Sequence, residues 1–471
     1  MLDESLSEDG ERLSLLLLSD THILFAELQS EARAIPRHLP VGGTPLKMIY
    51  SHALECLIVA VKVDDQPTLK FVDPDTGKDL SKPSKKDGQI VDYISGLGNH
   101  GDRIHGLAEW EYKKENRTWR FILVSTHEGR LLVVSTEREE PQGSERGMVR
   151  YWTRYKKKDY DRPIYSVLGH ADGLLFCAGT TIYWEILDDV EKKLKPMKQY
   201  ELSSPATSLR VVNGKILALT TKDSLEIIDF GTDQTSGQMQ LSHSDPVSRR
   251  ALHMMEIAGD VEGTPESSVV LLCDIYCGIA GLWVPWRQPN RDCEVLFEAD
   301  LPASIRKFRR GRTAPGWLQA QRRPQFGLIP STIDGAEIFG MGIDGSLQHF
   351  ALLNMEVWRL LRFIQNIACE SPLFSLYQHN TGVDDDFDPE PRVTRDLEMH
   401  VNGDLLQRIS AKRALEQLLN KPSHISRYIE LIDEIDDGRC TADFEGEPGE
   451  MKEQYLELGY DILDYFLAPV L

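Results

Sequence analysis

One pattern recurs over the first three-quarters of the chain and limits the folds that are open to it. An apolar, β-branched run meets a short polar or glycine-containing turn, and a second apolar run, often ending in an aromatic residue, follows. The pattern occurs in seven units, whose starts lie 42 to 69 residues apart, at Leu13–Leu28, Cys56–Val72, Arg120–Thr136, Gly173–Ile186, Lys215–Phe230, Ser267–Val284 and Ala336–Leu352. Blades joined by loops of variable length give spacings of this kind.

Each unit predicts a β-hairpin. The turns His127-Glu128-Gly129, Asn213-Gly214 and Asp344-Gly345 supply residues that tolerate positive φ, and no unit has a sustained apolar period of 3.6. A lone hairpin buries too little surface to be stable, so the units must share a core, as they do when stacked radially. We therefore predict a mainly β fold, a seven-bladed β-propeller over residues 1–352. Two β-sandwiches in series are the alternative, although the unit spacing is long for sandwich strands.

The pattern changes near residue 352, and residues 353–471 are predicted to form a small all-α domain. Met355–Ile367 places Val357, Leu360, Leu361, Ile364 and Ile367 on one helical face. Three amphipathic stretches follow, at Leu405–Leu419 with a break at Ser410, at Ser423–Ile435 with Ser423 as the expected N-cap, and at Met451–Leu467. This tail is acidic, because residues 351–471 hold 24 acidic and 11 basic side chains.

Composition narrows the setting in which the protein acts. The net charge of −21 argues against a protein that coats nucleic acid over its whole surface. The acidic start of the chain does not fit a secretory signal, and the apolar tract Leu15–Leu18 is far too short to cross a bilayer, so no membrane association is expected. Seven scattered cysteines fit a reducing compartment. We expect an intracellular, soluble protein.

No motif in the sequence indicates catalysis. Cys273 and Cys277 have no second ligand pair at zinc spacing and are interpreted as core residues on one face of a strand. His22, His105, His170 and His253 lie near predicted strand ends without a nucleophile motif, and the glycines of Gly340–Gly345 lie in a predicted hairpin without a following helix. We predict a protein that is not an enzyme, with no catalytic or metal-binding residues, no cofactor and no small-molecule substrate.

One basic segment is a candidate nucleic-acid-binding site. Residues 301–333 contain no acidic side chain but interleave cations with aromatic residues. Such interleaving suits phosphate pairing and base stacking. The candidate residues are Arg306, Lys307, Arg309, Arg310, Arg312, Trp317, Arg322 and Arg323. A solvated loop, an import signal, and a docking face for an acidic partner, including the chain's own acidic tail, are the alternatives for this segment, and Trp152 with Tyr155–Lys158 forms a weaker second cluster.

Three stretches resemble the CPSF A subunit family. Ala32–Val61 is similar to a strand that leads through a proline-bearing segment into the next blade, and Gly342–Ala368 resembles the family's last strand and first C-terminal helix. The sharpest similarity is Val401–Ser410, where Gly403, Asp404, Leu405 and Leu406 match the structural motif that opens a helix of the terminal domain. The resemblance covers the third propeller and the helical end of the family.

This resemblance implies a function. Family members include the large subunit of the UV-damaged-DNA-binding complex, a cleavage and polyadenylation subunit and a splicing factor 3b subunit, which act as assembly platforms in the nucleus. We therefore expect a nuclear, non-catalytic scaffold whose partners are other subunits of a complex for DNA repair, mRNA cleavage/polyadenylation or splicing. DNA or RNA contact is direct or through these partners; the alternative function is a subunit that binds nucleic acid directly through residues 306–323.

The chain departs from the family at its start. Nothing in it resembles the family's first two propellers, including the middle one that docks a cullin in the ubiquitin-ligase member, so the cullin role is not carried over. A truncated gene model, a product of a split gene, or a short paralogue would each account for this length.

Overall fold

The computed structural model describes most of the chain. The described residues are 13–18, 23–28, 38–114, 117–140, 146–157, 160–170, 172–188, 193–231, 238–257, 269–310, 338–351, 353–377, 399–436, 441 and 448–467.

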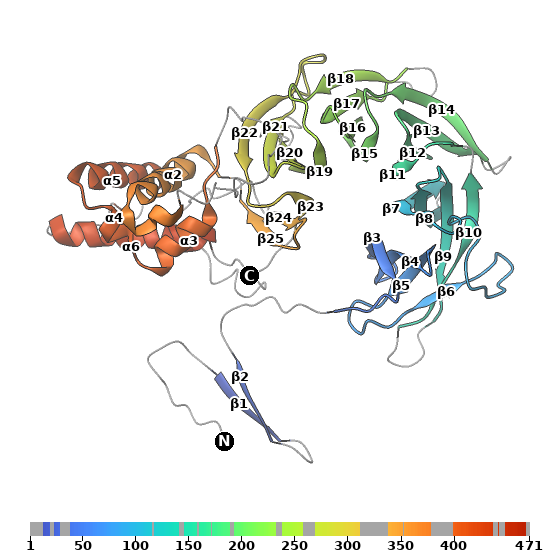
Figure 1. Cartoon of the computed structure of the whole chain (residues 1–471), viewed down its shortest axis with the longest axis horizontal. Coiled ribbons are helices and arrows are strands. Elements are labelled where there is room, and N and C mark those ends of the chain that lie inside the picture. The colour runs from blue at the N-terminus through green and yellow to red at the C-terminus, as the bar shows by residue number, and fades with distance from the viewer. Residues whose placement is uncertain are drawn as a thin grey trace, which may run out of the picture.

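Six antiparallel sheets are arranged radially in a ring, and each begins with its innermost strand (Figure 1). The first two sheets contain β3 (Thr44–Ser51), β4 (Cys56–Val63) and β5 (Gln66–Val72), then β7 (Ile104–Lys114), β8 (Arg117–Thr126), β9 (Leu131–Arg138) and β10 (Val149–Lys157), with β6 (Ser81–Pro83) parallel to β10. The next two contain β11 (Ile164–His170), β12 (Gly173–Ala178), β13 (Thr181–Asp188) and β14 (Lys193–Glu201), then β15 (Ala206–Val212), β16 (Lys215–Thr220), β17 (Leu225–Asp229) and β18 (Gln240–Ser244). The last two contain β19 (Ala251–Ile257), β20 (Val269–Asp274), β21 (Gly278–Trp283) and β22 (Glu294–Asp300), then β23 (Ile305–Arg310), β24 (Ile338–Gly342) and β25 (Leu347–Phe350).

The predicted mainly β propeller arrangement followed by helices is confirmed, with six sheets in the ring. Six of the seven predicted units coincide with the second and third strands of these sheets. The first unit forms a separate hairpin, β1 (Leu13–Leu18) with β2 (Ile23–Leu28), which pairs with no other strand of the described chain. The described ring therefore contains one sheet fewer than the seven that the repeat predicts.

Apolar layers between neighbouring sheets hold the ring together. In most sheets the second strand is buried on both faces, and β12 and β20 are buried at every residue. Alternate side chains of one strand therefore enter two different cores, as in β12, where Leu174 faces the preceding sheet and Leu175 the following one. Burial on both faces explains why these strands are continuous apolar runs in the sequence.

The six innermost strands share one irregularity. Each carries a β-bulge at its second or third residue, where the pairing skips Leu46, His105, Tyr165, Thr207, Leu252 or Arg306. A bulge sharpens the local twist and re-aims the residues beside it. Because it recurs, it also gives a common register in which equivalent positions of the six sheets can be compared.

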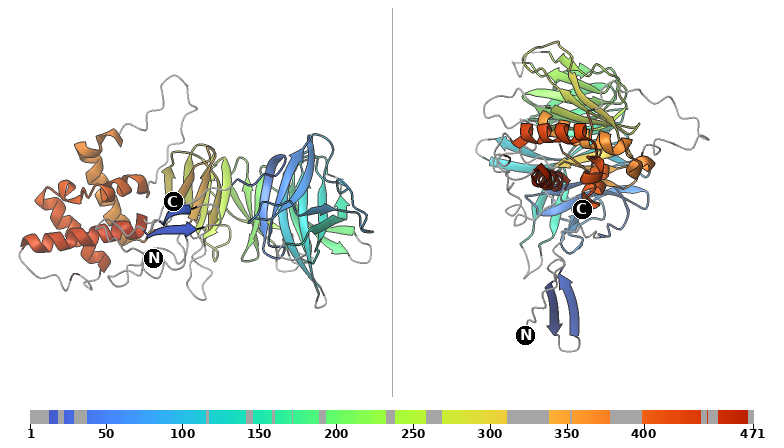
Figure 2. Two further views of the ribbon diagram at one scale, coloured as in Figure 1. Left: turned by 90° about the horizontal axis from the view of Figure 1, so that it is seen from below. Right: turned by 90° about the vertical axis from the view of Figure 1, so that its left-hand side faces the viewer.

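The helices form a second apolar core beside the ring. They are α2 (Met355–Glu370), α3 (Gly403–Ala411), α4 (Leu415–Leu418), α5 (Pro422–Asp436) and α6 (Pro448–Leu467), with a 3₁₀ helix over Pro372–Tyr377. Their buried faces share one cluster that includes Leu360, Leu406, Ile432 and Leu463. In Figures 1 and 2 the helices lie outside the ring, next to the sheet of β23–β25.

Two predictions about helix ends are wrong. The break after α3 falls at residues 412–414, where Arg413 has a φ of 46°, and Ser410 donates a hydrogen bond to Asp464 instead of capping a helix. Ser423 is not an N-cap, because α5 begins one residue earlier at Pro422, whose fixed φ suits the first helical turn. Among the described residues, no helix has the length and apolar character needed to cross a membrane.

Candidate functional site

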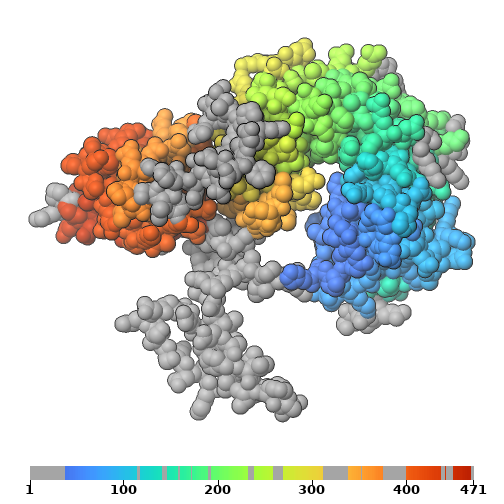
Figure 3. Space-filling view, viewed as in Figure 1, coloured from blue at the N-terminus to red at the C-terminus, as the bar shows by residue number. Residues whose placement is uncertain are grey.

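The centre of the ring is hollow and basic. The innermost strands line it, and in Figure 3 the hollow opens outward between the sheet of β3–β5 and the sheet of β23–β25. Strand β23 carries the exposed side chains of Arg306, Arg309 and Arg310 and the half-buried side chain of Lys307, whereas Ile305 and Phe308 are buried. We call these four residues, together with Lys47 on β3 and Arg210 on β15, the basic centre.

The cations of the basic centre repel one another through space. Burial first, and then Lys307 and Arg306 on β23, lower the pKa of Lys47 to about 8. Burial also lowers the pKa of Arg210 and of Lys307, with Arg309 as the next cause for both. Three separate strands therefore bring like charges close enough to disfavour each other's protonated forms.

Little negative charge compensates this cluster. Within the described parts of the chain, no carboxylate forms an ion pair with Lys47, Arg210 or Lys307. Glu256 on β19 is the acidic neighbour of Arg210 and Arg310, and burial raises the pKa of its carboxyl group. Lys47 instead donates a hydrogen bond to the carbonyl oxygen of His105 at 2.5 Å. An anion entering the centre would relieve the repulsion, and guanidinium groups suit phosphate or carboxylate oxygens.

The sequence predicted four of the six residues of the basic centre. Of the predicted nucleic-acid-binding residues, Arg306, Lys307, Arg309 and Arg310 lie together on β23, whereas Arg312, Trp317, Arg322 and Arg323 lie outside the described residues. Lys47 and Arg210 were missed, because each is the single charged residue of its strand. The signal that could have found them is the register of the repeat, which places both on innermost strands.

His253 is held neutral at the edge of the basic centre. Its Nδ1 accepts a hydrogen bond from the backbone N–H of Phe308 at 3.2 Å. Burial first, and then Arg210 and Lys307, lower its pKa to about 3. The pKa of His105 is lowered in the same way: burial first, and then the neighbouring His127 and Lys47, lower it to about 4.

This state predicts a loss of stability in acid. The unfolded chain takes up a proton on His253 near pH 6.5, whereas the folded chain does so only near pH 3, so the stabilisation is complete above 6.5 and is lost as the pH falls. Between pH 7 and pH 5 we expect His253 to account for a loss of about 2 kcal/mol in the free energy of unfolding. His253→Gln keeps a hydrogen-bond acceptor and should remove that part of the pH dependence in urea denaturation; a slope equal to that of the unmodified chain would contradict this role.

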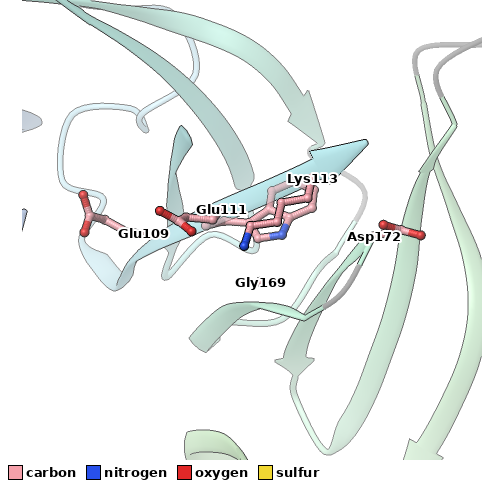
Figure 4. Close-up of a pocket in the computed structure, with 6 residues that line it drawn as sticks. Glu109, Glu111, Lys113, Gly169 and Asp172 are labelled. Atoms are coloured by element: carbon pink, nitrogen blue, oxygen red, sulfur yellow. The ribbon is translucent and has the colours of Figure 1, made fainter. Parts of the chain in front are cut away.

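A second, acidic concavity lies between the second and third sheets (Figure 4). It has a volume of about 380 Å³ and is lined by Glu109, Trp110, Glu111, Lys113, Gly169 and Asp172. A side chain at Gly169 would place its Cβ 1.9 Å from Trp110 Cδ1, so only glycine lets β11 approach β7 here. Figure 4 shows Glu109 and Asp172 on opposite sides of the concavity. Its lining includes three carboxylates and one lysine, so its charge is opposite to that of the basic centre.

The cysteines and histidines do not converge. Cys273 is buried in β20, but Cys277 is half-buried in the turn after it, with a φ of 61°, so the prediction that both lie on one face of a strand is wrong. Cys273 donates to the carbonyl oxygen of Ile305. Within the described ranges, no three His, Cys, Asp or Glu side chains gather closely enough to hold a metal ion.

The stretch Val401–Ser410, which the sequence analysis compared with the CPSF A subunit family, contains the start of α3. Asn402 is the N-cap, and its side chain accepts a hydrogen bond from the backbone N–H of Leu405 at 3.2 Å. Gly403 and Asp404 form the first turn, where a carboxylate suits the helix dipole. Leu405 and Leu406 are buried in the helical core. These four residues therefore have structural positions in the helical part.

Fold and site together define a class: a propeller-type ring with a basic centre, followed by a helical bundle. A comparison with protein-family models and with curated proteins finds no match for the chain. Membership of the CPSF A subunit family therefore stays a prediction from the three stretches that resemble it.

Proposed function

We propose that the protein is a non-catalytic nuclear scaffold, a seven-bladed propeller with a helical end, that assembles protein complexes acting on DNA or RNA. A rigid ring offers a broad surface on its faces and rim, and its function is set by the partners that bind there. The resemblance to the CPSF A subunit family supports a role in repair, mRNA cleavage/polyadenylation or splicing. The nucleus is the compartment that this role requires.

The outer rim carries the supporting observation. The outermost strands of three successive sheets, β14, β18 and β22, each expose a large apolar side chain: Met197 is 36%, Leu241 43% and Leu296 43% exposed. Met197 and Leu296 are the extra residues of β-bulges, which turn them outward, and Leu241 adjoins a third bulge. Apolar anchors beside unpaired strand edges suit a partner that adds a strand or packs a helix.

Substitution of these apolar anchors by charged residues should weaken the binding of partner subunits. We expect Met197→Asp/Leu296→Asp to reduce the amount of co-purifying subunits at least tenfold (about 1.4 kcal/mol of binding free energy or more) when the tagged chain is isolated from nuclear extract. Ile90→Asp is the matched control, because Ile90 is 63% exposed and lies away from these strands. Retention of the same subunits by the double variant, with unchanged circular dichroism, would contradict the role of the rim; a tagged chain excluded from nuclei would contradict the compartment.

A second function, direct binding of nucleic acid, is favoured by the basic centre. Strand β23 contributes four cations to a hollow that already holds Lys47 and Arg210. Clustered cations with few acidic neighbours attract a phosphate backbone even in a chain of negative net charge. A single strand fits this proposal better than a duplex, because the cations lie inside a ring. Its affinity would fall steeply with salt.

A further inference from the structure

The two sheets at the opening of the ring expose side chains that every other sheet buries. In the common register, one position of the innermost strand faces the preceding sheet: Leu107, Val167, Leu209, Met254 and Phe308 occupy it and are 0–6% exposed. Met48 holds the same position on β3, opposite Val59, and is 50% exposed. The rest of that face is covered, because Val59, Val61 and Val72 are 0–2% exposed and pack with Val41 from the segment before β3, so the open part of the face lies around Met48.

The last sheet shows the mirror image of this exposure. The position of the second strand that faces the following sheet is held by Ala60, Ser125, Cys177, Leu219 and Cys273, which are 0–1% exposed. Its equivalent on β24 is Met341, at 52%. The residue of the third strand that pairs with this second-strand position is also buried in the first five sheets. These residues are 0–5% exposed: Leu69, Leu131, Ile182, Leu225 and Ile279. In the last sheet the equivalent residue is Leu347, which pairs with Met341 and is 44% exposed.

These exposures describe a slot for one more sheet. Met48 belongs to the sheet of β3–β5, and Met341 and Leu347 belong to the sheet of β23–β25. These are the two sheets between which Figure 3 shows the hollow opening outward. The exposed residues of both walls, Met48 on the one and Met341 with Leu347 on the other, are apolar, and the equivalent residues of the other sheets are buried against a neighbouring sheet. A wedge buried between the two walls must therefore be apolar on both of its faces.

The hairpin β1–β2 has that character. Every residue of its two strands is apolar except Ser14 and Glu27, which lie opposite each other. Four residues separate its strands, as they do between β8 and β9, between β16 and β17 and between β24 and β25, which are second and third strands of their sheets. An isolated hairpin with two apolar faces is not stable in water, so this one needs cover on both sides.

The length of the connection between the hairpin and the ring is also compatible with a place for the hairpin in the slot. Fifteen residues, 29–43, separate β2 from β3, and seventeen, 189–205, separate the third strand β13 from the next innermost strand β15. A segment of fifteen residues reaches up to about 50 Å when extended. We infer that residues 13–28 insert between β3–β5 and β23–β25 as the second and third strands of a seventh sheet, which closes the ring. This inference rests on the seven-bladed ring of the proposed function.

Thiol accessibility tests this closure in the full-length chain. Met48→Cys and Met341→Cys place a thiol on each wall, and Ile275→Cys, in the turn between β20 and β21 and 40% exposed as isoleucine, is the control for an open position. With labelling of the native cysteines subtracted, we expect maleimide to react with the two wall thiols at least about 100-fold more slowly than with the control, because a covered thiol reacts only through local opening. Deletion of residues 13–28 should raise both rates to within a few-fold of the control.

Each other outcome overturns the inference. Wall thiols that react like the control in the full-length chain would show an open slot. Wall thiols that stay protected after the deletion would show another occupant, a second copy if protection depends on concentration and a different protein if it does not. Should a cysteine variant misfold, hydrogen exchange on the unmodified chain decides: closure predicts that β1 and β2 amides exchange as slowly as those of β4, and exchange within seconds would exclude it. Neither readout requires a scaffold partner, so failure of the closure can be distinguished from failure of the scaffold role.

Discussion

Replacement of Arg249 by methionine is expected to lower the free energy of unfolding by about 3–5 kcal/mol. Arg249 lies on the link between β18 and β19, and its side chain is only 6% exposed. It bonds to Asp245, which is fully buried after β18, and to Glu298 on β22. Burial alone would lower the pKa of Arg249, but its bonds to these carboxylates outweigh burial and raise it. The variant would leave both carboxylates buried without their cation at the junction of two sheets.

Urea denaturation followed by circular dichroism measures this loss. Arg291→Met is the matched control, because Arg291 pairs with Glu294 on the surface, where both side chains are about half exposed, and such a pair contributes at most about 1 kcal/mol. Adding Asp245→Leu and Glu298→Met to Arg249→Met should recover much of the stability, since an apolar set replaces the buried ions. Equal midpoints for Arg249→Met and Arg291→Met would refute the role of this network.

Charge reversal on β23 should have the largest effect on binding. For Arg309→Glu/Arg310→Glu we expect at least a hundredfold loss of affinity for a single-stranded oligonucleotide at low salt, about 2.7 kcal/mol or more. Both side chains are exposed, so the fold should tolerate the change, and Arg309 is the cation nearest in effect to Lys307 and Arg210. Two fewer phosphate contacts should also reduce the slope of log affinity against log salt by about 1.4.

The control variant Lys85→Glu/Lys86→Glu distinguishes an effect of the charge on β23 from an effect of the net charge of the protein. It changes the net charge of the protein by the same amount, on an exposed turn outside the hollow. Fluorescence anisotropy across a salt series should show near-normal affinity for this control. An equal loss in both variants would mean that net charge alone governs binding, and unchanged affinity in the β23 variant would exclude the basic centre as a nucleic-acid site.

Much of the fold was predictable because its determinants are local. Runs such as Gly173–Ala178 and Val269–Asp274 are continuously apolar since their strands are buried on both faces, and short polar turns mark the hairpins between strands. The helical end was equally readable from the spacing of Leu360, Leu361 and Ile364. The first residue of a helix was harder to predict, because Pro422 and Ser423 both suit the start of α5, which begins at Pro422.

Only four of the six residues of the basic centre were predictable, for a geometrical reason. Arg306 to Arg310 are neighbours in sequence, so their cluster is visible in the sequence alone. Lys47 and Arg210 are each separated from this cluster by more than ninety residues of sequence. Nothing in the sequence near either residue indicates that its strand lines the hollow and that its charge acts on β23. Strand order within each sheet decides which residues face the centre, and that order is a tertiary property.

The sequence by itself determined which segments become strands and helices and that the strands repeat, because alternation, turn chemistry and helical period act over a few residues. The tertiary structure alone decided which cations meet in the hollow and which apolar side chains stay uncovered. Met48 and Met341 look like any other core residue in the sequence; their exposure appears only when six sheets are placed side by side, because burial depends on the neighbouring sheet rather than on the strand that carries the side chain.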